Sequence, residues 1–153
     1  MTRQGTKVIA MEPLSEAIET FFREYEKNTN LADAERLASQ FADTFMAADP
    51  SGARVVQAAD LRAAISRRQQ LFASLGCRST TLLSLHETKM DDRHVMVRAE
   101  WRMQFDRGLD GLEEVRLPST FIVHRSGEAL RIVFYLTHEN LMTVLRDRGL
   151  LPP

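Results

Sequence analysis

Hydrophobic residues recur every three or four positions in the first half of the chain, and this spacing predicts amphipathic helices. Three such stripes run through residues 14–25, 31–45 and 61–75. Asn30 and Asp60 are candidate N-caps of the second and third helices, because short polar side chains accept hydrogen bonds from free backbone N–H groups. We therefore expect three helices in this half.

Turn residues divide these helices. Asp49-Pro50-Ser51-Gly52 predicts a tight turn, since Asp, Pro and Gly each favour one by a different mechanism. Residues 53–57 follow as a short strand, and Gly76 is placed to end the third helix.

Beyond Gly76 the hydrophobic period becomes two, which predicts strands at residues 80–88, 93–105, 114–125 and 130–136. Ser126-Gly127 is a hairpin turn. One face of these strands is apolar, with Trp101, Met103, Phe105, Leu117, Ser119, Phe121, Ile132, Phe134 and Leu136. The other carries Arg98, Glu100, Arg102, Glu114, Arg116 and Arg131, with Ile122 and Tyr135 as its apolar members. A closing helix is expected after Thr137, its candidate cap.

These elements predict an α+β fold in which a curved, antiparallel four-stranded sheet carries a short extra strand. The three N-terminal helices would pack on its concave apolar face, with a short helix at the C-terminus. Helices packed into a curved sheet form a cone, and the wide end of a cone favours an open pocket. We expect residues 1–12 to be a loose leader and residues 13–149 to form one domain.

Composition narrows the function classes. The 153 residues carry a net charge of −1 and one cysteine, Cys77. The charge gives no basis for binding nucleic acid or an anionic membrane, and no apolar run is long enough to span a bilayer. Four histidines lack metal-ligand spacing, and no glycine-rich phosphate loop occurs. We expect a cytoplasmic protein without metal or cofactor.

The order of elements over residues 13–138 resembles the nuclear transport factor 2-like fold, which includes ketosteroid isomerase and the SnoaL-like cyclases. Tyr25, Asp33, Glu35, Phe41 and the turn from Asp49 to Gly52 align without a gap with the isomerases. The resemblance implies an oxyanion-donor role for Tyr25 and a proton-transferring role for Asp49. It also implies a homodimer formed through the convex sheet face.

The chain departs from the isomerase pattern at two positions. Ser119 stands where the resemblance places the second oxyanion donor, a protonated aspartic acid in the isomerase. Leu136 replaces an aromatic residue. A serine hydroxyl is the weaker donor, so both departures argue against steroid isomerisation itself.

Each candidate residue also has a plain structural interpretation. Asp49 can be an ordinary turn residue, Tyr25 a helix aromatic with its tip in solvent, and Ser119 a partner of backbone groups. The apolar candidates can form either a cavity wall or a solid core. These candidates are Phe21, Phe41, Phe45, Trp101, Met103, Leu117, Phe121, Phe134 and Leu136.

Three functions remain open at this point. We favour a domain that binds a small apolar molecule in its pocket. The second hypothesis is an isomerase, dehydratase or cyclase with Asp49 as base and Tyr25 and Ser119 as oxyanion donors. The third is a protein-interaction module without catalysis. A cavity that contains both Asp49 and Tyr25 would favour the enzyme.

Overall fold

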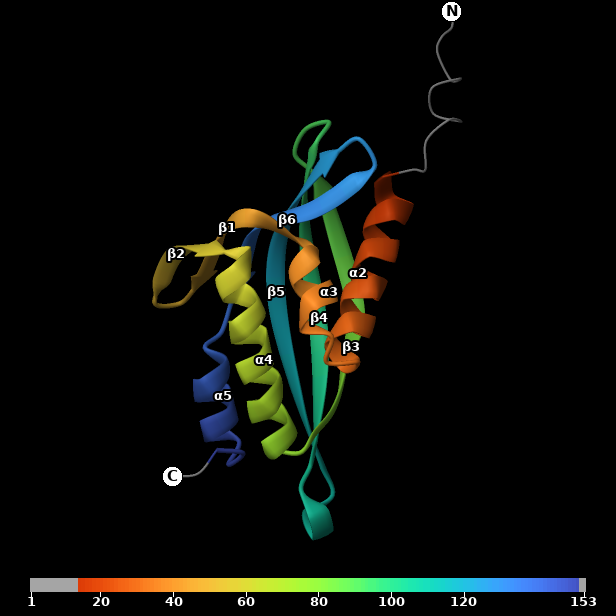
Figure 1. Ribbon diagram of the computed structural model, residues 1–153. Coiled ribbons are helices and arrows are strands. Elements are labelled where there is room, and N and C mark those ends of the chain that lie inside the picture. Colours follow the sequence, from red (N-terminus) through yellow and green to blue (C-terminus); the bar gives the residue numbers. More distant parts are fainter. Residues whose placement is uncertain (1–13, 152–153) are drawn as a thin grey trace, which may run out of the picture.

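A curved sheet with helices on one face forms the protein (Figure 1). The computed structural model describes residues 14–151, so the leader predicted at residues 1–12 lies outside the described residues. The helices are α2 (Leu14–Asn30), α3 (Ala34–Ser39), α4 (Ala58–Ser74) and α5 (Leu141–Asp147), with a 3-10 turn at Gly108–Asp110. The strands are β1 (Phe41–Asp49), β2 (Gly52–Gln57), β3 (Cys77–Lys89), β4 (His94–Asp106), β5 (Leu112–Ser126) and β6 (Ala129–Thr137).

The six strands pair in the order β2-β1-β6-β5-β4-β3. The hairpins β3–β4, β4–β5 and β5–β6 are antiparallel, as the alternating pattern predicts. The pairing of β1 with β6 is parallel and joins the two halves of the chain. The α+β class is confirmed, whereas the expected four strands and one short extra strand were too few.

The missing strand comes from the region predicted as the second helix. Helix α3 ends at Ser39, and Phe41 and Phe45 belong to β1. Both side chains are buried, as predicted, but on one face of a strand rather than of a helix. A spacing of four residues returns to the same face in either structure, because four is a multiple of the strand period and close to the helical one.

All three predicted helix caps were wrong. Asp33 caps α3 by accepting a 3.1 Å hydrogen bond from the N–H of Arg36. Asn30 instead joins α2 to β3, since its side chain bonds both the N–H and the carbonyl of Thr80 at 2.8 Å.

The two later caps also differ from the prediction. Gln57 precedes α4 without a side-chain cap bond, and Asp60 lies in the first turn of the helix. Asn140, rather than Thr137, caps α5 through the N–H of Thr143.

A β-bulge in β6 changes the face of the residues that follow it. Ile132 pairs with Val123 and Phe134 with Ile122, so Val133 has no partner on β5. After the bulge, Tyr135 and Thr137 lie on the inner face. Phe134 and Leu136 therefore lie on the outer face, contrary to the unbroken alternation predicted for this strand.

The inner face of the sheet packs against α2 in an aromatic cluster. Phe22 and Phe121 are fully buried with ring centroids 4.9 Å apart, and the Tyr135 ring stacks on Phe121 at the same distance. A second cluster around Phe105 and Leu145 holds α5 against β4 and β5. In the described part of the chain, no helix is long and apolar enough to cross a membrane.

Candidate functional site

A cavity of about 130 Å³ lies beside the aromatic cluster, between α2, α4 and the inner face of the sheet. Its wall is mainly apolar. Helix α4 contributes Leu61, Ile65 and Phe72, and the strands contribute Phe41, Trp101, Met103 and Leu117. The cavity is comparable in size to an engineered cavity of about 150 Å³ that binds benzene. It therefore fits a molecule with one small ring.

Tyr25 separates the packed cluster from the cavity. Its ring centroid lies 5.5 Å from those of Trp101 and Phe121, and its side chain also lines the cavity. Burial raises the pKa of the Tyr25 hydroxyl, and the neighbouring Tyr135 raises it further, whereas the Arg68 guanidinium lowers it. The hydroxyl is therefore protonated at neutral pH and can donate a hydrogen bond.

A second group of hydroxyls enters from the sheet. Ser119 on β5 pairs in register with Thr137 on β6, and Phe121 pairs with Tyr135. Ser119, Thr137 and Tyr135 all line the cavity. Tyr25 and Ser119, the two predicted oxyanion donors, are thus brought to one cavity by elements that are far apart in the sequence.

Asp49 is not among the residues that line this cavity. It ends β1 at the hairpin to β2, where its carboxylate accepts bonds from the Ser51 hydroxyl at 2.5 Å and the Ser51 N–H at 2.8 Å. These bonds hold the pKa of the carboxyl below its ordinary value. The side chain is thus engaged in the turn, which matches the plain interpretation of an Asp before Pro.

The predicted pocket residues divide into three groups. Phe41, Trp101, Met103 and Leu117 line the cavity. Phe21, Phe45 and Phe121 belong to the packed cluster. Phe134 and Leu136 are placed on the outer face by the bulge in β6, so the prediction that they face inward was wrong.

Three charged or amide side chains at the cavity were not among the predicted site residues. Arg68 and Gln69 enter from α4, and Glu139 from the segment between β6 and α5. Arg68 holds its guanidinium carbon 5.1 Å from the centre of the Phe72 ring. The signal that could have revealed it is the i, i+4 spacing of Arg68 and Phe72 on one helix face.

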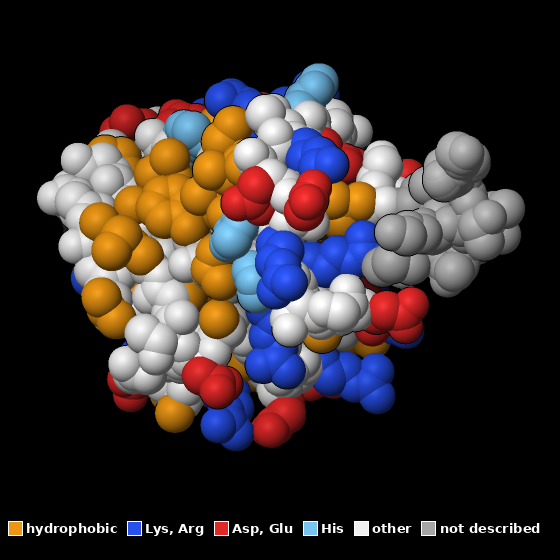
Figure 2. Space-filling model, turned by 90° about the horizontal axis from the view of Figure 1, so that it is seen from above, with side chains coloured by type: hydrophobic (Ala, Val, Ile, Leu, Met, Phe, Trp, Pro, Cys, Tyr) orange, Lys and Arg blue, Asp and Glu red, His pale blue; other side chains and the backbone are white. Residues whose placement is uncertain are grey.

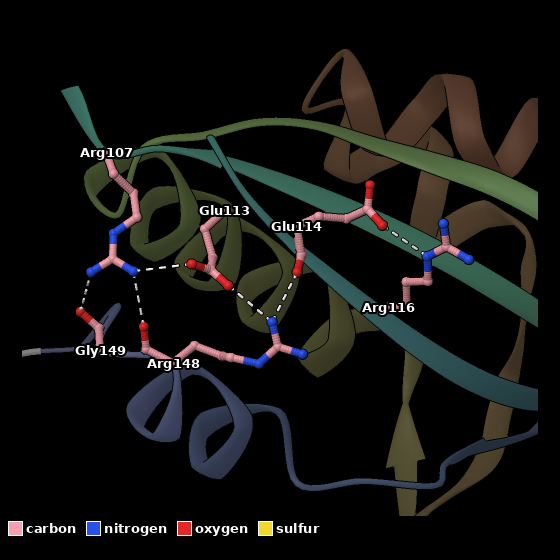
Figure 3. A network of polar contacts seen from close by, with 6 residues as sticks. All are labelled: Arg107, Glu113, Glu114, Arg116, Arg148 and Gly149. Carbon is pink, nitrogen blue, oxygen red and sulfur yellow. Dashed lines mark hydrogen bonds and ion pairs between the residues drawn. The ribbon is translucent and has the colours of Figure 1, made fainter. Parts of the chain in front are cut away.

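A network of ion pairs holds α5 at the cavity (Figure 3). The Glu113 carboxylate accepts bonds from Arg148 at 2.9 Å and from Arg107 at 3.2 Å, and these bonds lower its pKa. Arg107 also donates to the carbonyl of Arg148 at 3.0 Å. The network fastens the C-terminal end of α5 to β5, while Leu141 at the other end lines the cavity.

Within residues 14–151, no group of three His, Cys, Asp or Glu side chains is arranged to hold a metal ion. The polar groups of the cavity are hydroxyls, one amide, one guanidinium and one carboxylate. Such a set can donate hydrogen bonds to an oxygen-bearing ligand.

Comparisons with known proteins agree with this architecture. A family model described as NTF2-like protein (DUF6841) matches residues 12–140. No curated protein matches the chain.

Solved structures match over most of the chain. Aln2 from a Streptomyces species has a TM-score of 0.70 at 15% identity and covers 90% of this chain and 99% of its own. An NTF2-like protein with a cystatin-like fold from Novosphingobium aromaticivorans gives 0.69 at 16% identity, covering 91% and 89%. A protein from the same species, provisionally called a scytalone dehydratase, gives 0.63 at 11% identity, covering 80% and 81%. At these identities the likeness establishes the fold alone.

Proposed function

Given that the chain belongs to the NTF2-like protein family, we propose that its cavity binds a small, largely apolar molecule. The observation that carries the proposal is the cavity of about 130 Å³ between α4 and the inner sheet face. Most of its wall is aliphatic or aromatic, and a few hydroxyl, amide and charged groups converge on it. This combination is typical of small-molecule sites, where apolar walls supply affinity and polar groups supply orientation.

A cavity-filling variant tests the binding function. Ser119→Leu adds a larger apolar side chain at the cavity wall, and we expect it to abolish binding of toluene, a probe that matches the apolar wall. Phe134→Leu on the outer face is the matched control and should retain binding. Binding is measured by ligand-detected NMR. Failure of the unmodified protein to bind toluene or other single-ring probes would contradict the proposal.

If Ser119→Leu does not fold, Leu117→Phe provides a second way to fill the same cavity. A folded cavity-filled variant that binds toluene as well as the unmodified protein would place the binding site elsewhere.

A second candidate function is an enzyme of the isomerase, dehydratase or cyclase kind. It is favoured by the protonated Tyr25 hydroxyl and Ser119 at one apolar cavity, and by the similarity to a protein provisionally called a scytalone dehydratase. Asp49 is engaged in its turn and does not line the cavity, so the enzyme would need another base. Glu139 carries the one carboxylate among the described lining residues. Turnover that survives Asp49→Asn but not Glu139→Gln would support this reassigned enzyme.

We also propose that two copies of the chain associate through the outer face of the sheet. Residues aligned across five strands form an apolar row there, defined as Val55, Met46, Phe134, Ile122 and Met96. Val55 is 62% exposed and Met46 42%. Figure 2 shows hydrophobic side chains gathered on one side of the molecule, with histidines beside them.

Charges further along the same face, six residues from the row on β5, favour a second copy as the occupant. Glu114 contacts Arg116 at 2.8 Å and Arg102 at 3.9 Å on the same face, so both signs of charge lie close together. A two-fold axis can then oppose unlike charges, as a self-complementary interface requires. The sequence analysis expected charges to dominate this face, but the bulge adds Phe134 and Leu136 to it.

Sedimentation velocity tests the association. Phe134→Glu places a charge in the middle of the row, and we expect it to shift a dimer to monomers. Arg67→Glu, on helix α4 over the opposite face of the sheet, is the control. A monomeric unmodified protein, or a dimer that Phe134→Glu leaves intact, would contradict association through this face.

A further inference from the structure

Helix α4 brings two polar side chains to the apolar cavity at successive positions, Arg68 and Gln69. The Nε2 atom of Gln69 is buried and has no hydrogen-bond partner. A buried donor without a partner is destabilising, so such groups are rare unless something else satisfies them. A ligand in the cavity that carries an acceptor oxygen could accept a hydrogen bond from this amide.

Arg68 lies at the exposed edge of the cavity and has no charged partner in the described part of the chain. Among residues 14–151 it forms no ion pair, whereas Arg62 on the same helix contacts Glu35 at 3.3 Å. Packing of its guanidinium on the Phe72 ring holds the charge beside the cavity wall, since both residues line the cavity. A guanidinium stacked on an aromatic ring still presents its N–H groups at its edge.

We propose that the bound molecule is a carboxylate on a single-ring apolar body, with its two oxygens held by Arg68 and Gln69. This inference rests on the proposed binding function and names its ligand class. One guanidinium and one amide donor match the two oxygens of one carboxylate. A phosphate would bring more charge and a third oxygen to a site that offers one cation.

Glu139 places a negative charge at the same cavity. Its carboxylate lines the same cavity and makes no ion pair with Arg68 within the described residues. A negative charge near the site repels a bound anion, so its removal should favour the ligand. Glu139→Gln is therefore expected to tighten the binding of a carboxylate and to leave that of a neutral ring unchanged.

The test compares three probes on the full chain: toluene, benzamide and benzoate. We expect benzoate to bind at least about tenfold more tightly than toluene, since hydrogen bonds to charged groups are the stronger ones. Arg68→Met should raise the dissociation constant of benzoate by about tenfold or more and change that of toluene by less than about twofold. Gln69→Leu should weaken both benzoate and benzamide. Dissociation constants come from NMR titration.

Arg67→Met is the matched control, because Arg67 is exposed on the same helix and does not line the cavity. It should leave all three dissociation constants unchanged. The melting temperature of each variant is recorded, and Arg68→Gln replaces Arg68→Met if the latter does not fold.

The outcomes separate the two proposals. Toluene binding without a preference for benzoate, or equal losses of both probes in Arg68→Met, would overturn the carboxylate inference and leave the binding function intact. If none of the probes binds, both proposals fail.

Discussion

The two sides of the Tyr25 ring differ sharply in packing. On one side, Phe22 and Phe121 are fully buried against each other and against the sheet. On the other side, the same inner face borders an open cavity beneath α4. Both sides use aromatic and aliphatic residues of similar type, so composition does not distinguish them.

The difference comes from the helices rather than from the strands. Helix α2 packs directly on the sheet through Ile18 and Phe22, which are completely buried. Helix α4 has only Ile65 buried and contacts α3 more than any single strand. A helix held away from a concave sheet leaves a space that the side chains beneath it do not fill. The packed side therefore carries stability, and the open side is available for a ligand.

The largest effect is expected in the packed side. Phe121→Ala removes a fully buried ring that contacts Phe22, Tyr25 and Tyr135. Loss of a buried phenyl ring usually lowers the free energy of unfolding by about 3–5 kcal/mol. Urea unfolding measures it. A loss below about 1 kcal/mol would mean that this side is not close-packed.

A smaller effect is expected from the ring at the boundary. Burial raises the pKa of Tyr25 above its ordinary value of 10.0, so the folded state holds this proton more tightly than the unfolded chain. This raised pKa makes its full contribution to the free energy of unfolding below pH 10.0. Above pH 10.0 the contribution falls by up to about 1.4 kcal/mol per pH unit. Tyr25→Phe should flatten this alkaline loss. Urea unfolding at several alkaline pH values tests it, and an unchanged slope would place Tyr25 in solvent.

A third variant weakens the ion-pair network that fastens α5 to β5. Glu113→Gln removes the charge that accepts bonds from Arg107 and Arg148. These bonds lower the pKa of Glu113, so their contribution is present above the ordinary carboxyl pKa and is lost as the pH falls through the lowered value. We expect a fall in melting temperature of roughly 1–3 °C at neutral pH. The difference from the unmodified protein should vanish in acid, which calorimetry can follow.

The smallest effect on the free energy of unfolding is expected at Ser119, two residues before Phe121. Ser119 lines the cavity on the same strand as Phe121, and Ser119→Ala removes a hydroxyl with little loss of packing. The free energy of unfolding should change by less than about 1 kcal/mol. The same urea titration applies. A change as large as that of Phe121→Ala would mean that both sides of the Tyr25 ring are equally packed.

Much of the fold follows from local patterns. The alternation from residue 93 to residue 125 places Val97, Trp101 and Phe105 on one face, and all three are buried as predicted. The family resemblance predicted from residues 13–138 is confirmed by the match over residues 12–140. These features depend on short-range order, which the sequence displays directly.

The errors arise where a distant partner decides the structure. Residues 41–45 form a strand because β6 and β2 lie on either side of them, and the spacing of Phe41 and Phe45 suits a helix as well. The bulge at Val133 depends on its pairing with β5. The cavity was expected from the cone, but Arg68 and Gln69 reach it only because α4 lies over that part of the sheet.

The bulge at Val133 determines which residues of β6 line the cavity and which lie on the outer face. Past this point, Tyr135 and Thr137 lie on the inner face at the cavity, and Phe134 and Leu136 lie on the outer face. Deletion of a single residue there would exchange the two sets and so change the cavity wall and the apolar row together. Point substitutions in β6 can change one face without the other, whereas an insertion or deletion of one residue changes both.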